Sequence, residues 1–152
     1  MRLLFQYAKK LLLSSCLCIV LISAAYGQDE TFRDYEFLYH TYQETVSMLN
    51  ELAEEYPNLV ELYSIGETAT GKREMWMMEL TNKQTGPAST KPGAYFDGNQ
   101  HDNEVMGGEV ATFLPYYLLT QYGDDEEITR LLDTRVLYIL PLANPDGAEA
   151  YI

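Results

Sequence analysis

The chain has 152 residues, of which 47% are hydrophobic and 22% charged, with 23 acidic and 10 basic side chains. This apolar content is too high for a disordered chain, and the length suits one domain of ordinary size. The net charge of −13 argues against nucleic acid or an anionic membrane as a partner, because both repel an acidic surface.

The first 27 residues have the layout of a secretory signal peptide. An apolar stretch over residues 11–25 follows a basic start, and the small residues Ala25 and Gly27 at its end predict cleavage before Gln28. We therefore expect an exported protein, secreted or periplasmic, without stable membrane association once the signal is removed. A retained membrane anchor and a lipid on Cys16 are the alternatives, but the apolar stretch is short against the about 20 residues that span a bilayer.

Removing this segment changes the chemistry of the remaining chain. Both cysteines, Cys16 and Cys18, lie within it, so the exported part would have no disulfide and no thiolate ligand. The segment also holds three of the ten basic residues and none of the 23 acidic ones. The exported part would thus carry seven basic and 23 acidic residues, a net charge of −16.

A helix is the first regular element expected after a polar lead-in over residues 28–38. Thr41 and Glu44 fit the capping box S/T-x-x-E. Apolar residues then recur at helical spacing until Pro57, which predicts a helix with one apolar face over residues 42–56.

The remaining elements alternate between strand and helix patterns. Two apolar segments joined by a turn-rich connection predict a β-hairpin, and the loop after it is followed by strands and helices in alternation. This order favours an α/β fold with a mixed sheet and helices on both faces. The predicted elements are strands at 59–65 and 74–81, a loop at 82–93, a strand at 94–97, helices at 104–122 and 124–134, a strand buried on both faces at 135–142, and a turn at 144–147.

The segment Asp97–Glu104 carries the most informative chemistry. It follows a predicted strand and opens a helix, so it lies at the carboxyl edge of the sheet, where α/β proteins bind ligands. His101 and Glu104, three residues apart, can present an imidazole nitrogen and a carboxylate oxygen to one point, and Gly98 permits a tight turn before them. Zinc in catalytic sites is held by three such protein ligands and a water, so the pair predicts two ligands of a zinc site.

The motif H-x-x-E alone is not specific. It occurs by chance in many chains, and a histidine and glutamate near a helix start can simply form a hydrogen-bonded pair that suits the helix dipole. The sequence around His101 and Glu104 is therefore needed to decide between the two interpretations.

That wider sequence resembles the zinc carboxypeptidase family, which includes carboxypeptidases A, B, E and T. The resemblance is carried by GNQHDNEVMGGEV from Gly98 and by RVLYILPLANPDG from Arg135, in particular as in the branch whose zinc motif is G-N-x-H-x-N-E. The helix and hairpin from Tyr39 onward are also similar, so the resemblance covers about residues 39–152. It implies an N-terminal part of a zinc carboxypeptidase catalytic domain, with a zinc-carboxypeptidase-like fold.

The resemblance also implies roles for particular residues. His101 and Glu104 match the first two zinc ligands of the family, and Asn144–Gly147 matches a segment that shapes the wall of the site. The third zinc ligand, the carboxylate-binding arginines, the substrate-contacting tyrosine and the general-base glutamate of the family all come later than Ile152. We therefore expect this chain alone to be inactive, although the parent enzyme would use zinc to hydrolyse the C-terminal bond of a peptide or protein.

One position departs from the pattern of some members. Asn103 stands where they have an arginine immediately before the glutamate ligand, although the branch with G-N-x-H shares this change. Polarisation of the substrate carbonyl would then depend on zinc and on later arginines.

The other polar residues have simpler expected roles. His40 is expected to be a structural or exposed histidine, and Glu109, about 140° around the helix from Glu104, is expected to face away from the site. The acidic run 124–127 is interpreted as a solvated helix start. Two other functions stay open: a zinc deacylase or amidase of the aspartoacylase type, which also uses H-x-x-E, and a non-catalytic interaction domain.

Overall fold

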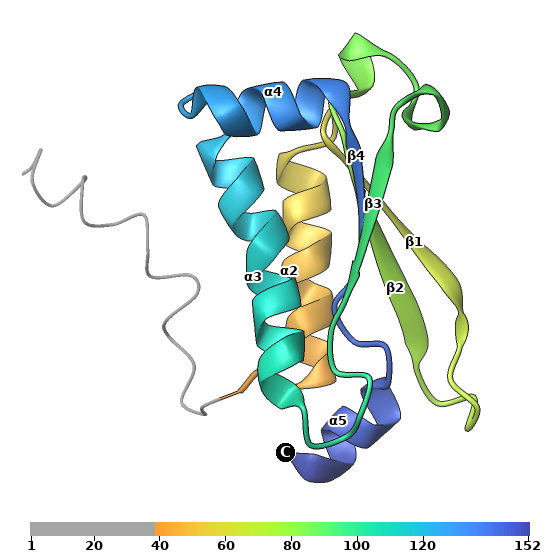
Figure 1. Ribbon diagram of the computed structural model, residues 1–152. Helices are drawn as coiled ribbons and strands as arrows, with labels where there is room; N and C mark the ends of the chain where they lie inside the picture. The colour runs from red at the N-terminus through yellow and green to blue at the C-terminus, as the bar shows by residue number, and fades with distance from the viewer. Residues whose placement is uncertain (1–38) are drawn as a thin grey trace, which may run out of the picture. The chain divides into compact units, whose positions relative to one another are not determined.

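The computed structural model describes residues 39–152, shown in Figure 1. The signal peptide expected over residues 1–27 and the lead-in over 28–38 lie outside the described residues. No helix in this part of the chain is long and apolar enough to cross a membrane.

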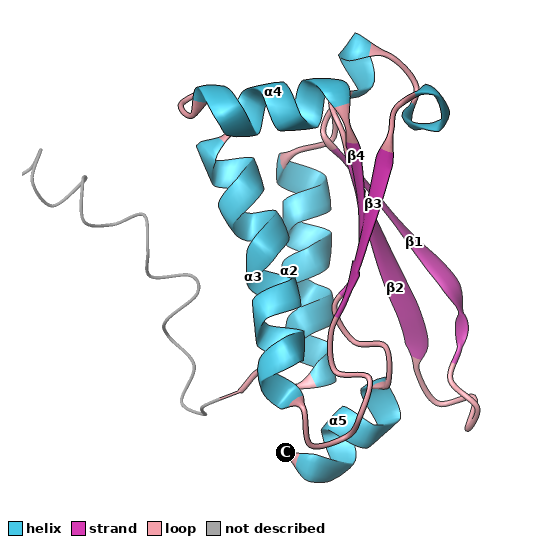
Figure 2. Ribbon diagram, viewed as in Figure 1, coloured by secondary structure: helices cyan, strands magenta, loops and turns pink. Residues whose placement is uncertain are grey.

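Within residues 39–152, four strands form one mixed sheet in the order β1-β2-β4-β3 (Figure 2). Neighbours β1 and β2 are antiparallel, as are β2 and β4, whereas β3 and β4 are parallel. The predicted hairpin and the mixed α/β class are therefore confirmed. The strands are β1 (Val60–Glu67), β2 (Glu74–Leu80), β3 (Gly93–Asp97) and β4 (Val136–Leu140).

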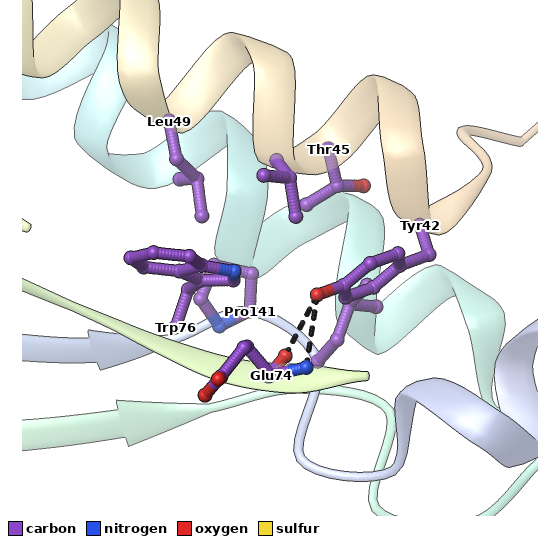
Figure 3. A pocket seen from close by; sticks show the side chains of 8 residues that line it. Tyr42, Thr45, Leu49, Glu74, Trp76 and Pro141 are labelled. Carbon is purple, nitrogen blue, oxygen red and sulfur yellow. Dashed lines mark hydrogen bonds between the residues drawn. The ribbon is translucent and has the colours of Figure 1, made fainter. Parts of the chain in front are cut away.

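Helix α2 (Tyr42–Glu55) starts at the predicted capping box and packs on the hairpin. The Thr41 hydroxyl accepts from the Glu44 amide, and the Glu44 carboxylate accepts from the Thr41 amide. Figure 3 shows this helix facing β2: Leu49 lies over the Trp76 ring, and the Tyr42 hydroxyl bonds to the backbone of Glu74. The buried face of α2 thus forms part of the core against the sheet.

Helix α3 (Val105–Gln121) lies beside α2, and Figure 1 shows both on the same face of the sheet. Helix α4 (Glu126–Thr134) lies within the predicted range 124–134 and adds Ile128 and Leu132 to the core between these helices and the strands. The second helical layer expected on the other face of the sheet is not among residues 39–152.

The opposite face of the sheet carries a polar and aromatic row. Met78 and Leu80 of β2 point into the core, so the alternating Glu79 between them points to the other face. The strand pairing places Glu61, Glu79, Tyr138 and Tyr95 side by side across all four strands. Burial and the neighbouring Glu61 raise the pKa of Glu79, so folding disfavours its charged form.

Replacing Glu79 with glutamine is expected to increase the free energy of unfolding at neutral pH by about 0.5 kcal/mol, since it removes a like-charge cross-strand pair. Because the pKa of Glu79 is raised in the folded state, its destabilising effect is present at neutral pH and is lost as the pH falls through that pKa. The gain should therefore shrink in acid. Urea unfolding followed by Trp76 fluorescence, at neutral pH and again in acid, measures the gain in the free energy of unfolding. Glu51→Gln, at an exposed position on α2, is the control. An equal gain at neutral and acid pH would contradict the conclusion that folding raises the pKa of Glu79.

The structure differs from the sequence prediction mainly at the C-terminal end. Residues 144–147 were predicted to form a turn, but they begin helix α5 (Pro145–Tyr151). Asn144 caps this helix by accepting from the Gly147 amide, and Pro145 occupies the first helical position, where its missing N–H costs nothing. The loop at 82–93 also contains two short 3₁₀ helices, η1 (Lys83–Thr85) and η2 (Ala88–Thr90).

Candidate metal site

The residues predicted to bind metal lie in the loop 98–104 between β3 and α3, which we call the metal loop. It leaves the carboxyl end of β3, beside the carboxyl end of the parallel strand β4. Two backbone hydrogen bonds join it to the segment after β4, from the Ala143 amide to the Gly98 carbonyl (2.9 Å) and from the Asn144 amide to the Asn99 carbonyl (3.1 Å). The two sequence motifs, far apart in the chain, are therefore held against each other at one edge of the sheet.

Gly98 is required by a close approach of two backbone segments. A Cβ at this position would lie 2.2 Å from the carbonyl oxygen of Gly107 in the first turn of α3. The unusual backbone conformation expected at Gly98 is found one residue later, at Asn99, whose φ is 50°. Asparagine tolerates this region better than most residues, so the turn into the metal loop is shared between two adjacent positions.

Asn99 was not singled out from the sequence, although it holds the metal loop. Its side chain is buried and donates from Nδ2 to the His101 carbonyl at 2.9 Å. This bond fixes the backbone of the loop at His101 itself. An asparagine directly after a glycine is a signal for a turn with positive φ, and this signal could have identified it.

The side chains of His101 and Glu104 lie next to each other, which fits both the predicted ligand pair and the alternative of a hydrogen-bonded pair. His101 Nδ1 lies 2.9 Å from Glu104 Oε2, and the two side chains are 71% and 56% exposed. Their mutual hydrogen bond raises the pKa of His101 and lowers the pKa of Glu104, because it stabilises the charged form of each. Glu104 is the N-cap of α3, so its backbone belongs to the helix start.

This pair fits part of a zinc site. Two ligands on one tetrahedral zinc lie about 3.3 Å apart, given zinc–nitrogen and zinc–oxygen distances of about 2.0–2.1 Å. The observed 2.9 Å separation is close to this value, and both donor atoms are accessible from solvent. Within residues 39–152, however, no three His, Cys, Asp or Glu side chains are grouped so that they could hold a metal ion. The described chain thus offers two ligands of the kind that zinc takes, and not a complete set.

The start of α5 forms the wall beside the metal loop. A Cβ on Gly147 would lie 2.8 Å from the Cβ of Asp102, so the helix and the loop are in close contact. Asp146, next to this contact, accepts hydrogen bonds from Thr70 (2.6 Å) and Arg73 (2.7 Å) of the hairpin connection. These hydrogen bonds lower the pKa of Asp146, with the Thr70 hydroxyl the larger cause.

His40 and Glu109 are paired with each other, apart from His101 and Glu104. The Glu109 carboxylate accepts from the His40 backbone amide at 2.6 Å, and its other oxygen lies 2.6 Å from His40 Nδ1. The His40 side chain is 5% exposed and the Glu109 side chain 19%. The expectation of a structural histidine is confirmed.

In the acidic run 124–127, Asp125 caps α4 by accepting hydrogen bonds from two backbone amides, which confirms that this run is a helix start.

The histidine–glutamate pair lies at the carboxyl edge of two parallel strands in a mixed sheet, which is where α/β proteins bind ligands. Comparison with known proteins specifies the class further. A family profile described as zinc carboxypeptidase matches residues 45–152. The chain belongs to the zinc carboxypeptidase family.

The relatives are longer than this chain. Human carboxypeptidase D is 31% identical over 129 residues, which cover 85% of this chain and 9% of that protein. A zinc carboxypeptidase of Saccharothrix mutabilis subsp. capreolus is 35% identical over 113 residues, which cover 73% of this chain and 25% of that protein. Among solved structures, carboxypeptidase A from Helicoverpa armigera superposes with a TM-score of 0.64 at 27% identity, covering 91% of this chain and 32% of that one. The chain therefore spans about a third or less of each relative.

Proposed function

We propose that residues 39–152 contribute two zinc ligands, His101 and Glu104, to a metallocarboxypeptidase that removes residues from peptide or protein C-termini. The observation that carries this proposal is the 2.9 Å approach of His101 Nδ1 and Glu104 Oε2 in the metal loop of a zinc carboxypeptidase fold. The relatives described above are named as carboxypeptidases, which supports the reaction class.

The described residues would supply the metal-binding half of such a site. A zinc ion here would polarise the scissile carbonyl and lower the pKa of a bound water. His101 and Glu104 would hold this ion, with the Asn99 side chain fixing the His101 backbone and Gly98 allowing the loop to pack on α3. Asn103 places a neutral amide beside Glu104, so no cation comes from that position.

Other parts of the reaction are not assigned to residues 39–152. By resemblance to the family, a third ligand, a general base and a cation for the substrate carboxylate are expected from elsewhere in the parent protein. His40 and Glu109 do not fill these roles, because each is engaged with the other.

The activity test compares the 152-residue chain with the same chain produced together with any coding sequence that follows Ile152. We expect zinc-dependent release of C-terminal residues from peptides only by the longer form, and loss of this release by chelator and by His101→Ala. Asp124→Asn, a conservative change at an exposed residue beyond the far end of α3, is the control and should keep activity. Release by the 152-residue chain alone would contradict the proposal. So would a longer form that releases only acyl groups from N-acyl amino acids, which would favour the deacylase alternative.

A further inference from the structure

One arginine joins the hairpin connection to the start of α5. Arg73 donates from Nη1 to Asp146 at 2.7 Å and from Nη2 to Glu149 at 3.1 Å. Thr70 donates to the second oxygen of Asp146 at 2.6 Å. A single guanidinium thus binds two carboxylates of one short helix, which a lysine cannot do with the same geometry.

Helix α2 completes the same contact. The Tyr42 amide donates to Glu149 at 2.8 Å, and the Arg73 guanidinium lies 5.7 Å from the centre of the Tyr42 ring. The Tyr42 hydroxyl bonds to the backbone of Glu74, directly after Arg73 (Figure 3). We call Tyr42, Thr70, Arg73, Asp146 and Glu149 the Arg73 cluster. It fixes α5 to two elements that are 73 to 107 residues away in the sequence.

The other side of α5 touches the metal loop. Gly147 packs against Asp102, the residue that follows His101, so closely that a Cβ would lie 2.8 Å from the Asp102 Cβ. The backbone amide of Asn144, the N-cap of α5, donates to the backbone carbonyl of Asn99, and the Asn99 side chain in turn donates to the His101 carbonyl. A shift of α5 would therefore be transmitted to the backbone that presents His101.

We propose that Arg73 is a positioning residue for the His101–Glu104 pair, acting through α5 without touching the metal. The inference rests on the proposed metal function of this pair. Without Arg73, Asp146 and Glu149 lose their shared cation, and like charges remain together on a helix of seven residues. Such a short helix has little stability of its own, so its contact with the metal loop depends on tertiary partners.

Zinc titration of the 152-residue chain tests this proposal without enzyme activity. The sequence has only two histidines, so the His101 imidazole signals can be followed separately from those of His40 by NMR. Excess magnesium would occupy sites made of carboxylates alone, because magnesium prefers oxygen ligands. Arg73→Met is expected to weaken zinc binding at His101 about tenfold, at the low end of the range for outer-shell partners. Arg73→Lys should recover part of this loss, and Thr70→Val should cause a smaller one.

Lys91→Met provides a matched control for lost stability. Lys91 Nζ donates to three oxygens, of Thr81, Asn82 and Thr85, before the start of β3, whereas the metal loop follows the end of that strand. This variant should lower the unfolding temperature and leave zinc affinity within about twofold of the wild type, since its contacts are distant from His101.

The outcomes separate the positioning role from the metal function. Weaker zinc binding in Arg73→Met and Thr70→Val, but not in Lys91→Met, supports the proposal. If the wild type binds zinc at His101 and both cluster variants bind it equally well, Arg73 has only a structural role and the proposal is wrong. If the wild type shows no zinc-dependent change at His101, the pair of ligands in residues 39–152 does not bind zinc without a further ligand, and the positioning role proposed for zinc binding by this chain is wrong.

Discussion

Replacing His101 with alanine is expected to abolish specific zinc binding by the chain. The described residues offer two ligands, and removal of the imidazole leaves one exposed carboxylate, Glu104. The loss of affinity should exceed the about 10- to 100-fold cost of removing an outer-shell partner, because a donor atom itself is lost. Calorimetric zinc titration in excess magnesium measures this change.

The same variant should be almost neutral for stability in the absence of metal. The His101 side chain is 71% exposed, and its partner Glu104 is 56% exposed, so little packing is lost. Asp124→Asn, which removes one exposed carboxylate beyond the far end of α3, is the control and should bind zinc as the wild type does. Unchanged zinc affinity in His101→Ala would show that zinc binds elsewhere on this acidic chain.

Gly98→Ala is expected to be the most destabilising single substitution near the metal loop. The added Cβ would lie 2.2 Å from the Gly107 carbonyl oxygen and 2.9 Å from the Gly108 amide nitrogen, and both are backbone atoms that cannot rotate away. The strand end or the start of α3 must shift, which we expect to cost about 3 kcal/mol, at the upper end of typical overpacking effects. Urea unfolding followed by the fluorescence of the single tryptophan, Trp76, measures this cost.

Gly123→Ala is the control that separates crowding from backbone conformation. Gly123 has a φ of 95°, but a Cβ there would meet nothing within 4 Å. Its replacement should cost about 1–2 kcal/mol from backbone strain alone. If Gly98→Ala were no more destabilising than Gly123→Ala, the close approach of β3 and α3 would not be the reason for glycine at position 98.

Local sequence patterns predicted most of the fold. The capping box at Thr41 and Glu44 placed the start of α2 at the observed residue, and the apolar segment at 135–142 contains β4. These predictions succeed because capping and burial of a continuous apolar strand depend on residues close in sequence. The pairing of His101 with Glu104 was also predictable, since residues three apart at a helix start are neighbours.

Features that depend on tertiary contacts were not predictable in the same way. Helix α3 has apolar residues around most of its circumference, so its sequence did not show that Leu118 would be buried and Val110 63% exposed. The Arg73 cluster joins residues more than 70 positions apart, and no local pattern indicates it. The start of α5 was predicted as a turn because asparagine, proline and glycine favour both a turn and a capped helix start.

The position of a bound zinc ion is the most direct test of the central claim. Crystals of the chain grown with zinc, measured at the zinc absorption edge, would locate the ion by its anomalous signal. The account predicts a peak at about 2.0–2.2 Å from a ring nitrogen of His101 and a carboxylate oxygen of Glu104. Zinc bound only at other residues, with His101 and Glu104 still paired to each other, would contradict it.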